Sequence, residues 1–278
     1  MHARLPSLTA AIVAAARDVA SWHLAADLGV DHQARHLLPL PVARGLELLD
    51  ELSPRIPMLA PVLRMAGLGI VTHIAWRTEI LDRAVAQAAR AGVRQLVILG
   101  AGLDARAWRM PALADVTVFE VDHPATQAWK RTKIENLQRL AADVRLVAVD
   151  FERQRVSDQL AAAGHEAAQP TLWLWEGVTM YLTREAIAAT LGELAQRSAQ
   201  GSILAMTYLT PEIVRLPKAL HPIVRLGFHL LREPLAGTLR PQEAATLLQQ
   251  HRLAVAADEG SPVRLFACER VLVTTGRA

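Results

Sequence analysis

The stretch Gln95-Leu-Val-Ile-Leu-Gly-Ala-Gly102 decides the fold. Its first five residues form a short apolar run, which is typical of a strand buried on both faces of a parallel sheet. Two glycines follow, and they permit either a close approach of a ligand to the backbone or a plain tight turn into a helix. The position three beyond Gly102 is Ala105, so the third glycine of a dinucleotide-binding loop is missing. No Gly-Lys-Ser/Thr follows either, which excludes a P-loop.

Further apolar runs predict more strands, and most of them end in an acidic residue. The runs are Val116–Val121 before Asp122, Val144–Val149 before Asp150, Thr171–Trp175 before Glu176, and Ser202–Tyr208.

Helices are predicted between these strands. They span Ile80–Ala91, closed by Gly92, then Pro124 to about Leu140, and a segment capped by Thr183 that runs to about Ser198. Strands that alternate with helices at about 25-residue spacing indicate βαβ units in an α/β domain.

The two ends of the chain differ from this pattern. Residues 1–75 are predicted to form a helical N-terminal cap, and residues 209–240 are rich in Pro and Leu and fit no simple element. Pro241 begins another helix. Leu253–Ala257 and Leu265–Thr274 are predicted as a closing hairpin, which departs from a plain dinucleotide-binding fold. We expect residues 1–278 to form one domain.

Composition excludes several classes of protein. The 278 residues are 52% hydrophobic and 21% charged, which excludes a disordered chain. No uncharged apolar run reaches ~18 residues, so we expect no transmembrane helix and no membrane partner. The single Cys268 excludes a disulfide framework and a cysteine-based zinc site, and no metal site is predicted. A net charge of +3 without a dense Lys/Arg run does not indicate nucleic acid as the partner.

Localisation is predicted from the first helix and the cysteine content. Arg4, the apolar stretch from Leu8 and Ala14-Ala15-Ala16 also fit a signal peptide. The pattern continues through Arg17 and Trp22 without a break, which favours an Ala-rich first helix. We expect a cytoplasmic protein.

The predicted strands place several side chains at one edge of the sheet. Because right-handed crossovers align the carboxyl ends of parallel strands, Gly100, Asp122, Asp150, Glu176 and Tyr208 should line one crevice. Such a crevice is where ligands bind in open α/β sheets.

Each of these positions has a functional and a structural interpretation. Asp122 can accept both hydroxyls of a ribose, or it can cap the helix that Pro124 opens; Glu120, on the same side of the strand, is the second candidate for the ribose. Asp150 and Phe151 can bind an adenine, or Asp150 can be another cap. Glu176 is placed to meet an amino group or a cation.

Charge indicates the cofactor. Two phosphates would require Lys or Arg beside the glycine turn, whereas this crevice has a carboxylate rim and Arg77 lies upstream. An adenosyl cofactor with a sulfonium, an amino group and one carboxylate fits better.

Three motifs carry a resemblance to a known family. They are Gly100-Ala-Gly-Leu-Asp-Ala-Arg-Ala-Trp-Arg109, Phe119-Glu-Val-Asp-His-Pro124 and Glu176-Gly-Val-Thr-Met-Tyr-Leu182. The chain resembles the leucine carboxyl methyltransferase family from roughly Leu8 to Thr275. The resemblance implies an enzyme that uses S-adenosylmethionine and has the class I methyltransferase fold, with a Rossmann-like, seven-stranded, mostly parallel sheet and a C-terminal antiparallel hairpin.

The resemblance also implies roles for individual residues. Arg77 would bind the methionine carboxylate, Gly100 and Gly102 would pass under the methionyl part, and Asp122 would hold the ribose. The remaining cofactor contacts would be Asp150 and Phe151 at the adenine and Glu176 at the methionyl amino group, with Tyr181 beside the transferring methyl and, by a looser match, Arg17 near the carboxylate. Asp104, Arg106 and Arg109 are expected to form a structural ion-pair set behind the glycine turn.

The reaction expected is methyl transfer to oxygen of a small molecule, most simply to a carboxylate, which is ionised at pH 7 and needs no base. A hydroxyl acceptor would need one, and Tyr208, His221 and His229 are the candidates; Tyr208 and His221 are also the predicted substrate contacts. Two other classes remain open: a nicotinamide-dependent oxidoreductase, and a catalytically silent partner that keeps the cofactor fold. The acceptor and the oligomeric state are not predicted.

Overall fold

The computed structural model describes residues 7–21, 33–56, 58, 62, 69–151, 153–211 and 236–275. In this part of the chain seven strands form one sheet in the order β3-β2-β1-β4-β5-β7-β6. The strands are β1 (Gln95–Leu99), β2 (Thr117–Asp122), β3 (Asp143–Ala148), β4 (Thr171–Trp175), β5 (Ile203–Leu209), β6 (Val255–Gly260) and β7 (Glu269–Thr274). Strands β1 to β5 pair in parallel, and β7 is antiparallel to both of its neighbours. The predicted mostly parallel sheet with a closing hairpin is confirmed.

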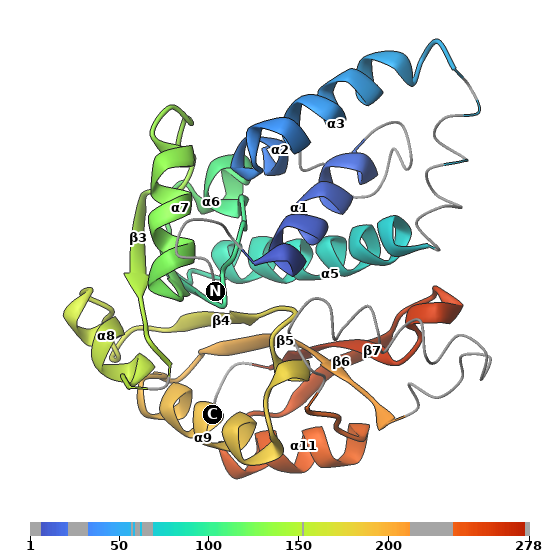
Figure 1. Cartoon of the computed structure of the whole chain (residues 1–278). Helices are drawn as coiled ribbons and strands as arrows, with labels where there is room; N and C mark the ends of the chain where they lie inside the picture. Colours follow the sequence, from blue (N-terminus) through green and yellow to red (C-terminus); the bar gives the residue numbers. More distant parts are fainter. Residues whose placement is uncertain are drawn as a thin grey trace.

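Helices cover both faces of the sheet. Figure 1 shows α8, α9 and α11 on one side, and α1, α5 and α6 on the other. The described helices and turns are α1 (Leu8–Ala20), α2 (Ala34–Leu37), α3 (Leu40–Leu52), α5 (Ile70–Arg90), α6 (Arg106–Arg109), η1 (Pro111–Leu113), α7 (Pro124–Ile134), α8 (Val156–Ala162), η2 (Thr179–Tyr181), α9 (Arg184–Gln196), α11 (Pro241–Gln250) and η5 (Arg264–Phe266). The predicted Thr183 cap is present, because the Thr183 side chain accepts the Ala186 N–H.

Two apolar cores lie on the two faces of the sheet, as the continuous apolar strands predict. Along β2, Phe119 and Val121 join the core beneath α8 and α9, while Val118 joins the core beneath α5. Trp173 and Trp175 of β4 are each only 2% exposed. Burying a large apolar side chain contributes ~1.5–3 kcal/mol, so these central strands fix the position of the loops that follow them.

Several boundaries differ from the sequence prediction. Helix α5 begins at Ile70, ten residues before the predicted start, because its first turns bury polar side chains such as His73 and hide the apolar period. Helix α7 ends at Ile134 rather than near Leu140, whose backbone N–H bonds to Ala107 O instead. The last strand is shorter than predicted, since Arg264–Phe266 forms a 3₁₀ turn.

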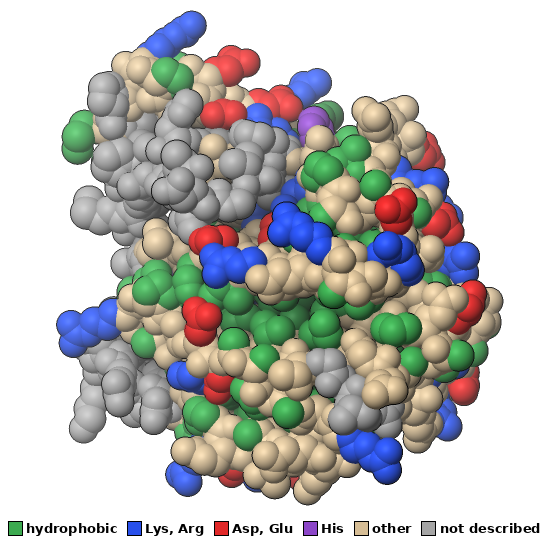
Figure 2. Space-filling view, turned by 180° about the vertical axis from the view of Figure 1, so that it is seen from behind, with side chains coloured by type: hydrophobic (Ala, Val, Ile, Leu, Met, Phe, Trp, Pro, Cys, Tyr) green, Lys and Arg blue, Asp and Glu red, His purple; other side chains and the backbone are tan. Residues whose placement is uncertain are grey.

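On the face seen from behind in Figure 2, acidic and basic side chains are interspersed and hydrophobic side chains gather across the middle. Within the described ranges, the helices are too short or too polar to cross a lipid bilayer.

Candidate active site

A cavity of about 300 Å³ lies at the carboxyl ends of β1, β2 and β4, with α1 forming one wall. This volume is at the small end of the range for small-molecule sites. Its lining includes predicted residues from separate segments of the chain: Arg77, Gly100, Gly102, Asp122, Glu176 and Tyr181. Parallel β-strand topology brings the glycine turn, Asp122 and Glu176 together, because β1, β2 and β4 end at the same edge. Arg77 comes from α5 and Tyr181 from the turn η2.

The two glycines of the turn after β1 are required by the local geometry. Gly100 has φ +65° and Gly102 has φ +51°, a region that side chains disfavour. A Cβ on Gly100 would lie 2.4 Å from Val178 Cγ2, and one on Gly102 would lie 3.2 Å from Ala10 Cβ. The turn therefore brings bare backbone to the cavity wall, as a ligand-binding turn needs.

Asp122 stands at the end of β2 and accepts two backbone hydrogen bonds. Its Oδ2 accepts the Gly102 N–H at 2.6 Å, and its Oδ1 accepts the His123 N–H at 2.6 Å. Burial raises the pKa of Asp122, while bonds from Gly102, His123 and Thr126 partly oppose that rise. The cap of α7 is His123, whose Nδ1 accepts the Ala125 N–H. Asp122 therefore supports the glycine turn and faces the cavity instead of capping the helix.

Glu120, the second candidate for the ribose, is separated from the cavity. It is fully buried and pairs with the Lys130 ammonium, which also donates to Asp104 O at 2.5 Å. Burial outweighs the attraction of Lys130 and raises the pKa of Glu120 to about 7. Its surroundings are those of a structural ion pair beneath the glycine turn.

Glu176 is enclosed by three guanidinium groups. Its Oε1 lies 2.6 Å from Arg17 NH2 and 3.0 Å from Arg77 Nε, and its Oε2 lies 3.0 Å from Arg106 NH1. Burial opposes ionisation, but the three arginines outweigh it and hold the pKa of Glu176 well below its usual range. Glu176 is thus a fixed anion, and Arg17 of α1, the loosest of the sequence matches, is part of the cavity wall.

The ion-pair set predicted behind the glycine turn is present and larger than expected. Buried Arg106 binds Asp104, and its Nε lies 2.7 Å from Asp82 Oδ1. Arg109 binds the other oxygen of Asp82 at 2.6 Å. Because Arg106 also faces Glu176, this set connects the floor of the cavity to helix α5.

Tyr181 lies in a turn that is bound to β5. Gly177 N–H donates to Thr207 Oγ1 at 2.8 Å, and Thr179 Oγ1 donates to Thr207 O at 2.6 Å. Gly237 N–H donates to Met180 O at 3.1 Å. These bonds on both sides of the turn fix the backbone that carries Tyr181 at the cavity.

Tyr208 was predicted to contact the substrate, and this prediction is wrong in the described structure. Strand β5 continues to Leu209, so Tyr208 lies inside the strand, is 1% exposed and belongs to the core beneath α9 and α11. Its hydroxyl donates to Asp258 Oδ2 of β6 at 2.7 Å. Burial and this bond raise the pKa of Tyr208. Its burial and its bond to Asp258 are those of a structural residue at the hairpin edge.

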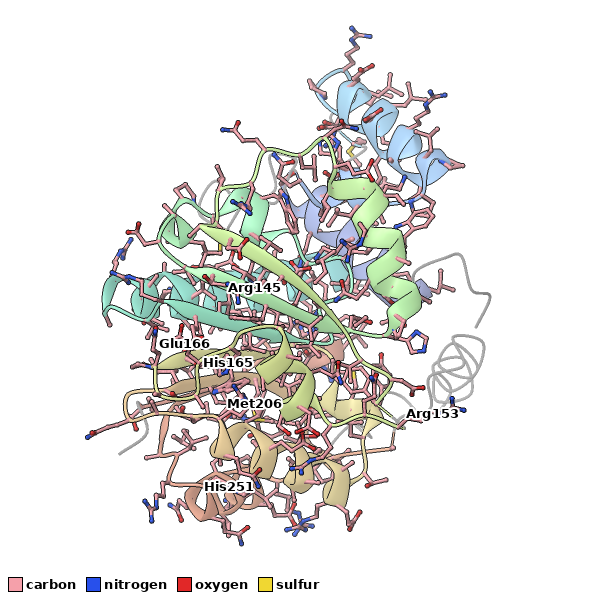
Figure 3. All side chains as sticks on the ribbon, turned by 90° about the vertical axis from the view of Figure 1, so that its left-hand side faces the viewer. Arg145, Arg153, His165, Glu166, Met206 and His251 are labelled. Carbon is pink, nitrogen blue, oxygen red and sulfur yellow. The ribbon has the colours of Figure 1, made fainter. Side chains whose placement is uncertain are left out.

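Other predicted residues lie beside the cavity or outside the described ranges. Asp150 and Phe151 follow β3 at the same sheet edge, but neither lines the cavity, and Phe151 is 53% exposed. Figure 3 shows the neighbouring Arg153 at the outside of the molecule. The structure therefore does not join the two predicted adenine contacts to the cavity wall. His221 and His229 are outside the described residues.

Sequence reasoning missed several residues at the site. Ser7 and Thr9, at the start of α1, line the cavity. Glu269 binds Arg77 NH1 at 2.8 Å from β7, 192 residues away. No local pattern marks such a partner, because the contact depends on where the last strand joins the sheet.

Proteins with related sequences are known in bacteria. A protein of Streptomyces coelicolor, provisionally named an S-adenosyl-L-methionine-dependent methyltransferase, is 38% identical over 170 residues, which is 60% of each chain. A Mycobacterium marinum protein with the same provisional name is 46% identical over 133 residues, 48% of this chain and 43% of its own. The chain thus matches less than two thirds of the length of either relative.

Solved structures share the fold. A methyltransferase-like protein from Thermobifida fusca superposes with a TM-score of 0.57 at 18% identity, over 100% of this chain and 97% of its own. Magnesium protoporphyrin IX methyltransferase from Synechocystis, solved with bound S-adenosylhomocysteine, superposes with a TM-score of 0.51 at 14% identity, over 75% of this chain and 87% of its own. The predicted class I methyltransferase fold is confirmed.

The sequence profile of leucine carboxyl methyltransferases matches residues 10–195, more than half of the chain. This range contains the glycine turn, Asp122, Glu176 and Tyr181, which all line the cavity. The chain therefore belongs to the leucine carboxyl methyltransferase family.

Proposed function

We propose that this chain is an S-adenosylmethionine-dependent O-methyltransferase that methylates a carboxylate of a small molecule. The observation that carries the proposal is the set of groups around the cavity: the glycine turn after β1, the Asp122 carboxylate at the end of β2, and Glu176 beside Arg17 and Arg77. Family membership and the names of the bacterial relatives support the cofactor and the methyl transfer, and the lining of the cavity supports the choice of a carboxylate acceptor.

The cavity wall fits the predicted cofactor. Such a ligand carries an ammonium and a carboxylate at one end, and Glu176 with Arg17 and Arg77 offers charges of both signs there. Buried Glu176 Oε2 makes no well-formed hydrogen bond within the described residues. Asp122 is placed to accept ribose hydroxyls, and the bare turn at Gly100 leaves room for a ligand against the backbone.

A dinucleotide fits the same wall less well. Among the described lining residues the cations are Arg17 and Arg77, and both lie against Glu176. Asp104 and Asp122 add negative charge beside the glycine turn, where pyrophosphate would sit. This arrangement counts against a nicotinamide-dependent oxidoreductase.

Catalysis under this proposal is mainly alignment. When bound, the cofactor would supply a methyl carbon on a sulfonium, which the acceptor oxygen would attack in line while S-adenosylhomocysteine leaves as the neutral thioether. The chain's own residues would hold that geometry: α1 forms one wall of the cavity, and the bond from Thr179 to Thr207 fixes the turn that bears Tyr181. Tyr181 would donate its hydroxyl hydrogen to orient the acceptor.

The lining favours a carboxylate over a hydroxyl acceptor. A carboxylate is already ionised near pH 7, whereas an alcohol or phenol needs a base. Glu176 is poorly suited to that role, because its arginines hold its pKa well below the usual range. The described lining contains no histidine. A hydroxyl acceptor remains the second candidate, since His221 and His229 lie outside the described residues.

Two experiments test the proposal. Calorimetric titration should show binding of S-adenosylmethionine and S-adenosylhomocysteine and none of NAD; micromolar binding of NAD alone would reverse the choice of cofactor. A panel of carboxylic acids, phenols and alcohols should then be incubated with methyl-labelled S-adenosylmethionine. The label should be released as methanol by mild alkali, as from an ester. An alkali-stable product would identify a hydroxyl acceptor, and binding without transfer to any acceptor would favour a silent partner.

The protein's location is part of the same proposal. We infer a cytoplasmic enzyme, supported by the lone Cys268 and a cofactor of the metabolite pool.

A further inference from the structure

Glu269 is a buried carboxylate that binds two side chains of one helix. It is the first residue of β7 and is 5% exposed. Its Oε1 accepts from Arg77 NH1 at 2.8 Å, and its Oε2 lies 2.7 Å from His73 Nε2. Because His73 and Arg77 are four residues apart in α5, they lie on the same face of that helix. One carboxylate therefore joins the last strand to the arginine at the cavity.

The far side of Glu269 is firmly anchored. His73 Nδ1 lies 2.9 Å from Ser261 Oγ, in the turn between β6 and β7. The His73 ring stacks on Phe266 with centroids 4.5 Å apart and planes 8° from parallel. Burial opposes ionisation of Glu269, but Arg77 and His73 bring its pKa down to about 2. Glu269 is therefore an anion with a fixed position, and it does not line the cavity itself.

Arg77 needs such an anchor to present a defined face to a ligand. It lines the cavity and is 4% exposed, and its Nε lies 3.0 Å from Glu176 Oε1. With Glu176 alone, a long arginine side chain could rotate about that single contact. A second carboxylate on NH1 fixes the guanidinium plane, and planar two-point contacts are what make arginine selective for carboxylates.

We propose that Glu269 is a positioning residue that holds the guanidinium of Arg77 in place to receive the carboxylate at the methionyl end of the cofactor. This inference rests on the proposed function. Glu269 acts through Arg77 and does not touch the cofactor.

Charge and positioning make opposite predictions for Glu269→Gln. Removing a negative charge beside Arg77 would, by charge alone, strengthen binding of a ligand carboxylate. If Glu269 positions Arg77, binding instead weakens, because the neutral amide holds the guanidinium less firmly. The sign of the change therefore distinguishes the two effects.

The test compares two nucleosides on the full-length protein. S-adenosylhomocysteine has the amino and carboxylate groups, whereas 5′-methylthioadenosine lacks them. By calorimetry, Glu269→Gln should bind S-adenosylhomocysteine about 10-fold more weakly, the lower end expected for one charged hydrogen bond, while 5′-methylthioadenosine stays within about threefold of wild type. Exposed Glu259→Gln on the neighbouring strand β6 is the matched control and should change neither.

Further variants make the result specific. In an Arg77→Lys background, Glu269→Gln should cause no additional loss of S-adenosylhomocysteine affinity, because its effect passes through the guanidinium. If Glu269→Gln does not fold, His73→Gln releases the same carboxylate on its other side and should give a smaller loss of the same selective kind.

Each other outcome overturns the inference. Equal weakening of both nucleosides would show that Glu269 only supports the fold, and unchanged or tighter S-adenosylhomocysteine binding would show that charge dominates. If the wild-type protein bound neither nucleoside, the proposed function would fail, and this inference with it. If the wild-type protein bound both but Glu269→Gln showed no selective loss, only this inference would fail.

Discussion

Mutation of the two carboxylates on one face of β2 should affect different properties of the protein, ligand affinity in one case and stability in the other. Asp122 lines the cavity, whereas Glu120, two residues earlier, is buried with Lys130 beneath the glycine turn. We predict that Asp122→Ala reduces affinity for the nucleoside and that Glu120→Ala reduces stability. The pair is informative because strand, face and charge type are shared, so only the surroundings differ.

The magnitudes follow from the contacts. A charged hydrogen bond contributes ~1.5–3 kcal/mol, so Asp122→Ala should weaken S-adenosylhomocysteine binding roughly 10- to 150-fold. Glu120→Ala leaves the Lys130 ammonium, only 1% exposed, without its anion, and breaking a buried pair costs about 3–5 kcal/mol. We expect the lower part of that range, because burial raises the pKa of Glu120 and so offsets part of the attraction between its anionic form and Lys130.

The assays are denaturant unfolding for stability and calorimetry for affinity. Replacing both members of the pair, as Glu120→Leu with Lys130→Met, is the control and should recover most of the lost stability, since apolar residues often substitute well for a buried ion pair. If Glu120→Ala lost about 10-fold or more in affinity while unfolding within about 1 kcal/mol of wild type, Glu120 would be the ligand carboxylate and the assignment of Asp122 would be refuted.

Three further predictions concern the glycine turn, the pH dependence of stability and the acceptor. Gly100→Ala should destabilise the fold by ~1–2 kcal/mol from its positive φ and ~1–3 kcal/mol from the contact with Val178, and adding Val178→Ala should recover only the second part in unfolding measurements. His165, which Figure 3 shows in the interior, has its pKa lowered to about 4 by burial and by Arg197. As the pH falls, the unfolded state therefore binds a proton at His165 before the folded state does, so the contribution of His165 to the free energy of unfolding should be complete above about pH 6.5 and fall by roughly 2–3 kcal/mol toward pH 4. In denaturant unfolding at several pH values, His165→Gln should flatten this slope. Tyr181→Phe should slow methyl transfer by no more than ~10²–10⁴-fold in a labelled-methyl assay with little change in cofactor affinity; loss of cofactor binding instead would contradict its placement beside the acceptor.

The fold could be predicted from sequence because its signals are local. The runs 95–99 and 171–175 have the strand boundaries that their apolar character predicts. Positive φ at Gly100 and Gly102 is a local requirement of the turn. Parallel topology then places the strand ends together, which is why the sequence by itself predicts Asp122 and Glu176 in one crevice.

The partners of the site residues could not be predicted, because they come from distant parts of the chain. Arg17 reaches Glu176 across 159 residues, and Glu269 reaches Arg77 across 192. The two tyrosines show the same limit: one further residue of strand places Tyr208 in the core, while Tyr181, in a turn, faces the cavity. The pattern of apolar residues along the sequence and the residues in its turns determined where the chain forms strands and where its backbone approaches a ligand. Only tertiary packing decided which charges meet there, since a buried charge is stabilised by the partners that the fold brings to it.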